Sequence, residues 1–335
     1  MADPASPDAA SLDGPMAVIG CGVIGSGWVA RLALCGLGVR WFDPAPAAGD
    51  RLGVVRSRAR RAWQALGIAA ANDEGPVVRV GSIGDAVQGA AVVFECLPER
   101  LDVKRAAYVD VEADALPAAL IASSTSGIRP TDLQAELIAP ERLVVAHPFN
   151  PVYLLPLVEV VAGAKTSAAS VETATAFLRQ LGMHPLHVRV EVDAFIADRL
   201  LEAVWREALW LINDGVATTE EVDDAIRFGF GLRWAHMGLF ETYRVAGGDG
   251  GIAHFLGHFG ESLTWPWSRL TDTPELTAEL IATIAAQSDA QTGDRTIADL
   301  EEARDTNLVA LLAALAANDA AAGRVISEQR RRVGG

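Results

Sequence analysis

A histidine and a glutamate lie twelve positions apart in residues 147–161, and their side chains suit the oxidation of an alcohol. Removing the proton of a secondary hydroxyl needs a base that works near neutral pH, and histidine is the natural choice. Glu159 could hold the His147 imidazole in one tautomer and stabilise the imidazolium, as carboxylates do in other histidine-based sites. A single histidine is more often structural, so this interpretation depends on a second signal.

The second signal is a glycine pattern about 125 residues earlier, which follows an expected strand and opens an expected helix. It reads Gly20-Cys21-Gly22-Val23-Ile24-Gly25. Gly20 permits a tight turn, Gly22 lets the backbone approach a pyrophosphate, and Gly25 lets helix and strand pack closely. The helix N-terminus would then supply amide donors to the phosphates. A tight turn without a ligand is the alternative.

The expected second strand ends at Asp43, 23 positions after Gly20. A carboxylate at this place can accept hydrogen bonds from both ribose hydroxyls of a dinucleotide. Residues 44–47 contain no cation that could hold a 2′-phosphate, so NAD is favoured over NADP. A methyltransferase that binds S-adenosylmethionine has a similar loop and acidic residue, but it would not predict the His/Glu pair.

Two more polar residues could bind the substrate oxygen. Ser126 follows an expected strand, and Asn150 comes three residues after His147. Ligands of open α/β sheets bind outside the carboxyl ends of the strands, so Ser126 and His147, each expected just after a strand, should lie at that edge. The serine cluster at 123–126 also fits a simple turn or cap.

These residues must be positioned by a sheet covered with helices. Residues 15–188 alternate β-branched runs with amphipathic stretches, which predicts a Rossmann-type, doubly wound, mostly parallel α/β domain. Strands are expected at 16–19, 39–42, 77–80, 91–95, 120–123, 143–146 and 157–161, and helices at 23–35, 47–66, 101–115 and 168–181.

The pattern changes after residue 188, and no strand signal returns. An amphipathic helix is predicted over 195–213, a capping box at 218–221 begins another that ends at Gly229, and an Ala/Leu-rich helix is expected over 306–321. Residues 189–321 should therefore form an all-helical domain for substrate binding and dimerisation. Residues 1–14 are expected to be a disordered leader and 322–335 a tail. So much apolar helical surface favours a homodimer.

Composition narrows the classes of partner. The formal charge of −15 argues against nucleic acid, and the arginine-rich segment 51–61 is expected to be a solvated helix face. No apolar run is long enough for a membrane span, and residues 1–14 lack the features of a signal peptide. Three cysteines without metal-ligand spacing indicate a reducing cytoplasm and no metal site.

The run His147-Pro148-Phe149-Asn150-Pro151 resembles the His-x-Phe-x-Pro signature of the 3-hydroxyacyl-CoA dehydrogenase superfamily, and the likeness extends from residue 18 to about residue 315. The resemblance implies His147 as base, Glu159 as its partner, and Ser126 and Asn150 as ligands of the substrate oxygen. It further implies that Glu99 and Lys104 form a pair on the cofactor side of the site, and that Leu97 and Pro98, just before Glu99, also contact the cofactor.

One residue departs from the family pattern. The chain reads Phe195-Ile196-Ala197-Asp198-Arg199, where the family commonly has Asn before Arg. A carboxylate therefore replaces an amide close to the expected substrate. The alternative is that Asp198 pairs with a neighbouring arginine such as Arg199 and never meets the substrate.

The second domain narrows the resemblance to the branch of the superfamily that oxidises L-carnitine. Similar segments are 198–209, 231–234, 237–244 and 265–267, while 231–234 has a weaker likeness to the lambda-crystallin and L-gulonate 3-dehydrogenase branch. Carnitine is a short 3-hydroxy acid with a trimethylammonium group, which aromatic faces and a carboxylate can bind. Trp234 and Asp198 are the candidates. Another 3-hydroxy acid (L-gulonate or a 3-hydroxyacyl-CoA) and a non-catalytic, crystallin-like NAD-binding protein remain alternatives.

Overall fold

The computed structural model describes residues 14–65, 70, 74–268 and 277–296, with parts of 299–318. The predicted tail, nearly all of the predicted leader and much of the helix predicted over 306–321 lie outside the described residues. The chain divides into two compact units, Met1–Leu200 and Leu201–Gly335. The domain boundary predicted after residue 188 stays a prediction.

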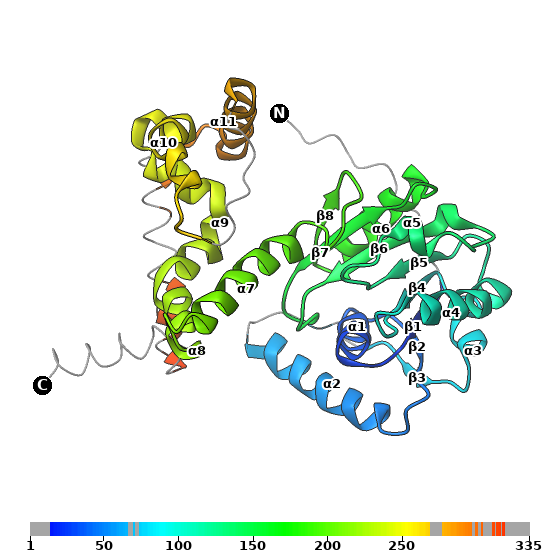
Figure 1. Cartoon of the computed structure of the whole chain (residues 1–335). Helices are drawn as coiled ribbons and strands as arrows, with labels where there is room; N and C mark the ends of the chain where they lie inside the picture. Colours follow the sequence, from blue (N-terminus) through cyan, green and yellow to red (C-terminus); the bar gives the residue numbers. More distant parts are fainter. Residues whose placement is uncertain are drawn as a thin grey trace, which may run out of the picture. The chain divides into compact units, whose positions relative to one another are not determined.

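The described part of the first unit contains an eight-stranded sheet in the order β3-β2-β1-β4-β5-β6-β7-β8 (Figure 1). The strands are β1 (Met16–Ile19), β2 (Val39–Phe42), β3 (Val77–Arg79), β4 (Val92–Glu95), β5 (Leu120–Ser123), β6 (Leu143–Pro148), β7 (Leu157–Ala162) and β8 (His184–Val188). The helices are α1 (Val23–Leu34), α2 (Ala48–Ala65), α3 (Ile83–Val87), α4 (Leu101–Asp114), α5 (Pro130–Leu133) and α6 (Ala168–Gln180).

Alternate residues of each strand point to opposite faces, and each face is packed against its own helices. Met16 and Val18 of β1 share a core with residues of α1, α2 and α6. Ala17 and Ile19 share another with residues of α3, α4 and α5. The sheet is therefore covered on both sides, which confirms the predicted doubly wound α/β fold.

The strand order reverses between β1 and β4. Strands β3 to β6 are parallel, so the carboxyl ends of β1, β4, β5 and β6 meet at one edge of the sheet. Open α/β sheets bind ligands at such a reversal point. The edge carries the glycine loop, the 96–99 loop, the Ser126 loop and the end of β6, so the topology brings together segments far apart in the sequence.

Strand β7 runs antiparallel to β6, and β8 pairs parallel with β7. The sheet is thus mostly parallel, as predicted. Strand β8 was not among the predicted strands, because its sequence His-Pro-Leu-His-Val has little β-branched character. The sequence also predicts that β6 ends before His147, and this is wrong: the strand continues to Pro148, so His147 is paired within it.

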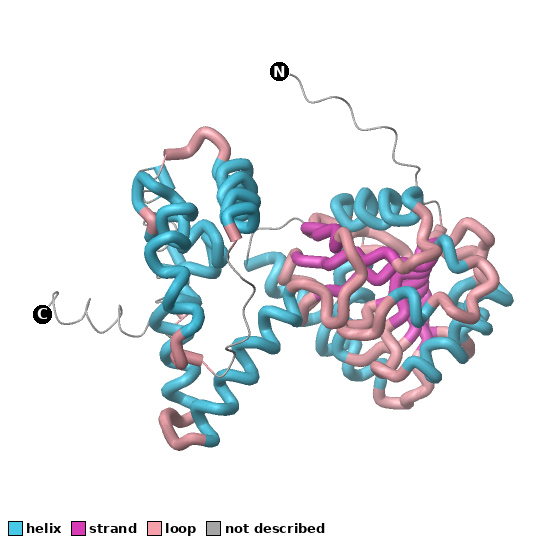
Figure 2. The backbone as a smooth tube through the Cα atoms, turned by 45° about the horizontal axis from the view of Figure 1, so that its top comes forward, coloured by secondary structure: helices cyan, strands magenta, loops and turns pink. Residues whose placement is uncertain are grey.

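Every regular element among the described residues of the second unit is a helix, whereas strands occur in the first unit (Figure 2). Helix α7 (Ala197–Asn213) spans the division. It is followed by α8 (Thr219–Ala225), a π-helical turn (Ile226–Phe230), α9 (Gly231–Ala246), α10 (Gly251–Phe259) and α11 (Ala278–Thr292), with short 3-10 turns at Gly248–Gly250 and Gly260–Thr264.

The capping box predicted at the start of α8 is confirmed. The Thr218 hydroxyl accepts a hydrogen bond from the amide of Glu221, and the Glu221 carboxylate accepts one from the amide of Thr218. The sequence predicts that this helix ends at Gly229, and this is wrong. Helix α8 ends at Ala225, and the π-helical turn that follows it leads directly into α9. Within the described residues, no helix is both long and apolar enough to cross a bilayer.

Candidate functional site

The glycine loop between β1 and α1 has the geometry that dinucleotide binding requires. Gly20 has φ +85°, a left-handed conformation that favours glycine. A Cβ on Gly25 would lie 1.8 Å from the carbonyl oxygen of Gly20, so helix and loop pack too closely for any side chain. A Cβ on Gly22 would meet nothing within 4 Å. The space beside Gly22 is open, and Gly22 is the N-cap of α1 without a side-chain cap, so the residues fit a bound pyrophosphate.

Asp43, directly after β2, connects the end of this strand to the glycine loop. Its Oδ2 atom accepts a hydrogen bond from the amide of Cys21 at 2.7 Å, and its Oδ1 atom accepts one from the amide of Ala45 at 2.8 Å. Each carboxylate oxygen has a second lone pair for a ribose hydroxyl. These hydrogen bonds fix the carboxylate beside the glycine loop, and its contact with a ribose stays a prediction.

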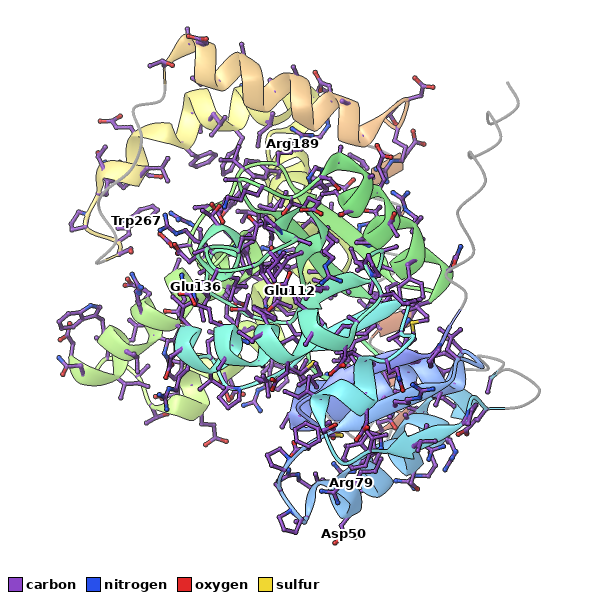
Figure 3. The ribbon with its side chains drawn as sticks, turned by 90° about the vertical axis from the view of Figure 1, so that its right-hand side faces the viewer. Asp50, Arg79, Glu112, Glu136, Arg189 and Trp267 are labelled. Carbon is purple, nitrogen blue, oxygen red and sulfur yellow. The ribbon has the colours of Figure 1, made fainter. Side chains whose placement is uncertain are left out.

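Arg79, at the end of β3, is a cation near this loop that reasoning from the sequence missed. Figure 3 labels it near Asp50 of α2. Its Nη2 atom donates hydrogen bonds to the carbonyl oxygens of Asp43 and Ala45, at 3.0 and 2.9 Å. Its guanidinium also lies over the Trp41 ring, 5.1 Å from the ring centroid. Because β3 pairs with β2, only the sheet register brings this residue beside Asp43.

His147 and Glu159 are direct partners across the antiparallel β6–β7 ladder. The Nδ1 atom of His147 lies 2.9 Å from Oε2 of Glu159, and both residues are buried. The other oxygen of Glu159 accepts hydrogen bonds from the amides of Ile196 and Ala197, each at 2.9 Å.

Burial by itself raises the pKa of the Glu159 carboxyl, but the hydrogen bonds from His147, Ala197 and Ile196 outweigh burial and lower its pKa. The carboxylate is therefore ionised near neutral pH and can only accept at His147. The Nδ1 atom then carries the hydrogen, and Nε2 is the basic nitrogen that can take a proton.

The chain turns sharply between β8 and α7, and this turn completes the surroundings of His147. Ala194 and Phe195 have φ of 59° and 50°, a conformation that is strained for residues with a side chain. The Phe195 and Phe149 rings pack against the imidazole, with centroids 5.7 and 4.9 Å away. The sequence did not predict that this turn brings the Phe195 ring to His147 and the Ile196 and Ala197 amides to Glu159.

Asp198, in the first turn of α7, lies on the other side of the imidazole from Glu159. Its Oδ2 atom is 3.8 Å from Nε2 of His147, and its side chain is partly exposed. Asp198 therefore lies beside the basic nitrogen, and its contact with the substrate stays a prediction.

Ser126 and Asn150 are exposed in the loops that follow β5 and β6. The amides of Ser126 and Gly127 both donate to Oε1 of Glu99, at 3.0 Å each. The peptide bond between Asn150 and Pro151 is cis. Both residues lie at the sheet edge that carries His147, because β5 and β6 are neighbouring parallel strands.

The predicted Glu99/Lys104 pair is present, with Nζ of Lys104 3.5 Å from Oε2 of Glu99. Lys104 is 1% exposed, however, and its shortest contact is with the buried Glu95, which the sequence analysis did not single out. Leu97 takes part through its backbone, because its carbonyl oxygen accepts a hydrogen bond from Lys104. Pro98 follows in the same loop after β4.

Trp234 lies in α9 of the second unit, where its ring packs against Phe230 with the centroids 4.5 Å apart. It is 38% exposed in this chain, and its predicted contact with substrate stays a prediction. Among the residues that the structure describes, no group of three or more His, Cys, Asp or Glu side chains could hold a metal ion.

Comparison with family models gives two matches that follow one another along the chain. Residues 15–192 match the NAD binding domain of 3-hydroxyacyl-CoA dehydrogenase, and residues 195–283 match the C-terminal domain of the same family. The two matches account for most of the chain.

Two curated relatives are named for L-carnitine. A Pseudomonas protein named L-carnitine dehydrogenase is 52% identical over 315 residues, which are 93% of this chain and 97% of that protein. A Ruegeria pomeroyi protein named L-carnitine dehydrogenase/betainyl-CoA thioesterase is 53% identical over 93% of this chain and 64% of its own length. The chain spans less than two thirds of the first curated relatives that it matches.

A solved structure shares both the fold and part of the sequence. It is an NAD-dependent 5-formyl-3-hydroxy-2-methylpyridine 4-carboxylic acid 5-dehydrogenase, 32% identical, with a TM-score of 0.71. The alignment covers 89% of this chain and 96% of the other.

Proposed function

The chain belongs to the 3-hydroxyacyl-CoA dehydrogenase family, and from this premise we propose that it oxidises the 3-hydroxyl group of L-carnitine to the ketone of 3-dehydrocarnitine, with NAD as cofactor. The observation that carries the proposal is 52% identity over nearly the whole length of a relative named L-carnitine dehydrogenase, in a chain whose His147–Glu159 pair is intact. The thioesterase activity in the names of longer relatives is not part of this proposal.

In the proposed reaction, Nε2 of His147 takes the hydroxyl proton as the C3 hydrogen leaves with two electrons. NAD, when bound, supplies the acceptor for that hydride. Glu159 stabilises the imidazolium that forms, because its carboxylate contacts Nδ1 at 2.9 Å and is itself held by two backbone amides. Ser126 and Asn150 are proposed to donate hydrogen bonds to the substrate oxygen.

Gly20, Gly22 and Gly25 are proposed to hold the pyrophosphate, together with the backbone of Cys21, Val23 and Ile24 at the start of α1. Support comes from the open space at Gly22 and the close packing at Gly25. Asp43 is proposed to bind the ribose hydroxyls. No step of the proton transfer depends on these residues, whose role is to place the nicotinamide.

Asp198 is proposed to bind the trimethylammonium group. In carnitine the cationic nitrogen is attached to the carbon next to the one that bears the hydroxyl, so a group that contacts the cation must lie near the base. Oδ2 of Asp198, 3.8 Å from Nε2 of His147, satisfies this requirement. Attraction between a carboxylate and a cation is strengthened where water is partly excluded. Trp234, on α9 of the second unit, stays a predicted aromatic contact of the substrate.

A homodimer is proposed from the apolar face of α7. Leu200, Leu201, Trp205 and Leu209 are between 46% and 60% exposed in the single chain, which is unusual for large apolar side chains on one helix. A second copy would cover this face. Light scattering of the purified protein tests the assembly. A cytoplasmic location is proposed from the cysteines, which are all free.

The substrate is tested by following NADH formation with L-carnitine, D-carnitine, L-gulonate and 3-hydroxybutyryl-CoA at matched concentrations. The proposal requires L-carnitine to have the highest kcat/KM. Preference for L-gulonate or for the acyl-CoA would assign another 3-hydroxy acid, and NAD binding without turnover of any substrate would assign a non-catalytic, crystallin-like role.

A further inference from the structure

A carboxylate is buried at the end of β4, beneath the loops that carry the proposed site. Glu95 is 0% exposed. Its Oε1 atom accepts hydrogen bonds from the Leu97 amide at 2.7 Å and from Nζ of Lys104 at 2.8 Å. Its Oε2 atom accepts from the hydroxyls of Tyr108 and Ser123, at 2.8 and 2.6 Å. Four donors surround one carboxylate, so Glu95 is held in place and does not face a ligand.

Lys104 links this buried carboxylate to a second one nearer the surface. Its ammonium lies between Glu95, at 2.8 Å, and Glu99, at 3.5 Å, and it also donates to the carbonyl oxygen of Leu97. With 1% exposure, the lysine side chain is enclosed by its own protein partners. A buried ammonium of this kind needs compensating anions, and the two glutamates provide them.

Glu99 in turn holds the loop that contains Ser126. Its Oε1 atom accepts hydrogen bonds from the Thr125 hydroxyl and from the amides of Ser126 and Gly127. Burial alone raises the pKa of Glu99, but the Thr125 hydroxyl, the Lys104 charge and the two amides together lower it. The carboxylate is therefore charged at neutral pH and can accept all three hydrogen bonds at once.

We propose that Glu95 and Lys104 are positioning residues, which act through Glu99 to fix the Ser126 loop relative to His147. The inference rests on the proposed dehydrogenase function for its kinetic consequence, but not for its structural one. It differs from a cofactor-side role for Lys104, because the ammonium is buried and is surrounded by Glu95, Glu99 and the carbonyl oxygen of Leu97. An error of about 1 Å in the position of a substrate ligand can reduce a rate by about a hundredfold.

The test uses the variant pair Lys104→Met and Glu95→Gln/Lys104→Met. The single variant leaves the Glu95 charge buried without its cation and should be destabilised, whereas the double variant removes both charges and should recover much of its Tm. In both, Glu99 has lost the ammonium. Hydrogen exchange at the Ser126 and Gly127 amides should accelerate about tenfold or more in the double variant, as expected when a charge-assisted contact is lost.

A matched control lies within the same domain. The amides of Ile138 and Ala139 both donate to the carboxylate of Glu112, which Figure 3 labels, at 2.9 Å each. Their exchange should not change in the double variant, because Glu112 pairs with Arg142, whereas Lys104 pairs with Glu95 and Glu99. If the amides of residues 138 and 139 exchange faster together with those of residues 126 and 127, the whole domain has been destabilised, and the proposal is overturned.

Kinetics supply the second measurement. The double variant should keep its NAD affinity within about twofold and lose about tenfold or more in kcat on whichever substrate the wild type turns over. Glu99→Gln changes a partly exposed side chain and should lower kcat by a similar factor. Added to the double variant, Glu99→Gln should lower kcat little further, because both changes act on the same loop. Equal loss of NAD affinity and kcat would assign the pair to the cofactor instead. If wild type fails to oxidise L-carnitine, the proposed substrate is wrong, while the exchange experiment still decides this inference.

Discussion

The Nε2 atom of His147 lies 3.8 Å from Oδ2 of Asp198, so the proposed base stands between two carboxylates. Its Nδ1 atom contacts Glu159 on the opposite side of the ring. One turn of the chain provides both arrangements, because the amides of Ile196 and Ala197 hold Glu159 and the next residue is Asp198. The base, its orienting carboxylate and the proposed cation ligand thus share a single local geometry.

Replacing Asp198 with Asn tests this geometry with almost no change in shape. If Asp198 binds the cation, kcat/KM for L-carnitine should fall about tenfold or more, equivalent to about 1.4 kcal/mol. The fall should be much smaller for an uncharged 3-hydroxy acid, which has no cation to lose. Steady-state kinetics on both substrates measure the difference. An equal loss on both, or none, would make Asp198 structural and leave cation binding to aromatic faces such as Trp234.

Replacing His147 with Ala should lower kcat at least about a hundredfold, since general base catalysis contributes about 10²–10⁴. The NAD dissociation constant should be almost unchanged, because His147 lies on β6, whereas the glycine loop follows β1, and β4 and β5 lie between these strands. Turnover assays and fluorescence titration with NAD measure the two quantities. Retention of most activity would remove His147 from the reaction.

Replacing Glu159 with Gln should reduce kcat less than loss of His147 does. It should also move the pH–rate profile to lower pH, because the imidazolium loses the anion that stabilises it. The pH profile of kcat/KM, measured for the wild type and the variant, tests this. An unchanged profile, or one moved to higher pH, would contradict the role of Glu159.

The same variant has a consequence for stability, whose sign follows from the lowered pKa of Glu159. A carboxyl that is more acidic in the folded than in the unfolded protein stabilises the fold above its unfolded pKa, and this contribution is lost as pH falls through the folded value. The wild-type advantage in unfolding free energy over Glu159→Gln should therefore persist at neutral pH and shrink below the ordinary glutamate value of 4.5. Denaturant titrations at several pH values measure it.

Replacing Asp43 with Ala should weaken NAD binding by about 1.5–3 kcal/mol, the contribution of a charge-assisted hydrogen bond. The unmodified protein should prefer NAD strongly, because the carboxylate would repel a 2′-phosphate. Arg79 does not cancel this effect, since it already donates to the carbonyl oxygens of Asp43 and Ala45. Titrations with NAD and with NADP measure the two dissociation constants. Equal use of both cofactors by the wild type would contradict the proposed binding of the ribose by Asp43.

Two alanine substitutions in the glycine loop should behave differently. Gly25→Ala places a Cβ 1.8 Å from a backbone oxygen, so it should destabilise the fold by about 1–3 kcal/mol and abolish NAD binding. Gly22→Ala meets open space in the protein and should keep the wild-type Tm, while weakening NAD about tenfold or more because the methyl group occupies the pyrophosphate's space. Tight NAD binding by Gly22→Ala would refute the placement of the pyrophosphate.

Much of the fold was predictable from local pattern. The period of apolar residues predicts most strands and helices, and the sheet is doubly wound as expected. The Thr218/Glu221 capping box was also readable, because its hydrogen bonds connect residues only three apart. Strand β8 was missed, since its place is determined by pairing with β7 and not by its own residues.

The sequence alone determined which residue types are present for chemistry, including a dinucleotide loop, a ribose carboxylate, and a histidine with a glutamate nearby. Only the tertiary structure decided how they meet. Antiparallel register puts His147 opposite Glu159, a strained turn brings Asp198 to Nε2, and strand pairing brings Arg79 to Asp43. The buried Glu95 contacts residues up to 28 positions away. Such contacts depend on which strands become neighbours, and no local spacing in a sequence contains that information.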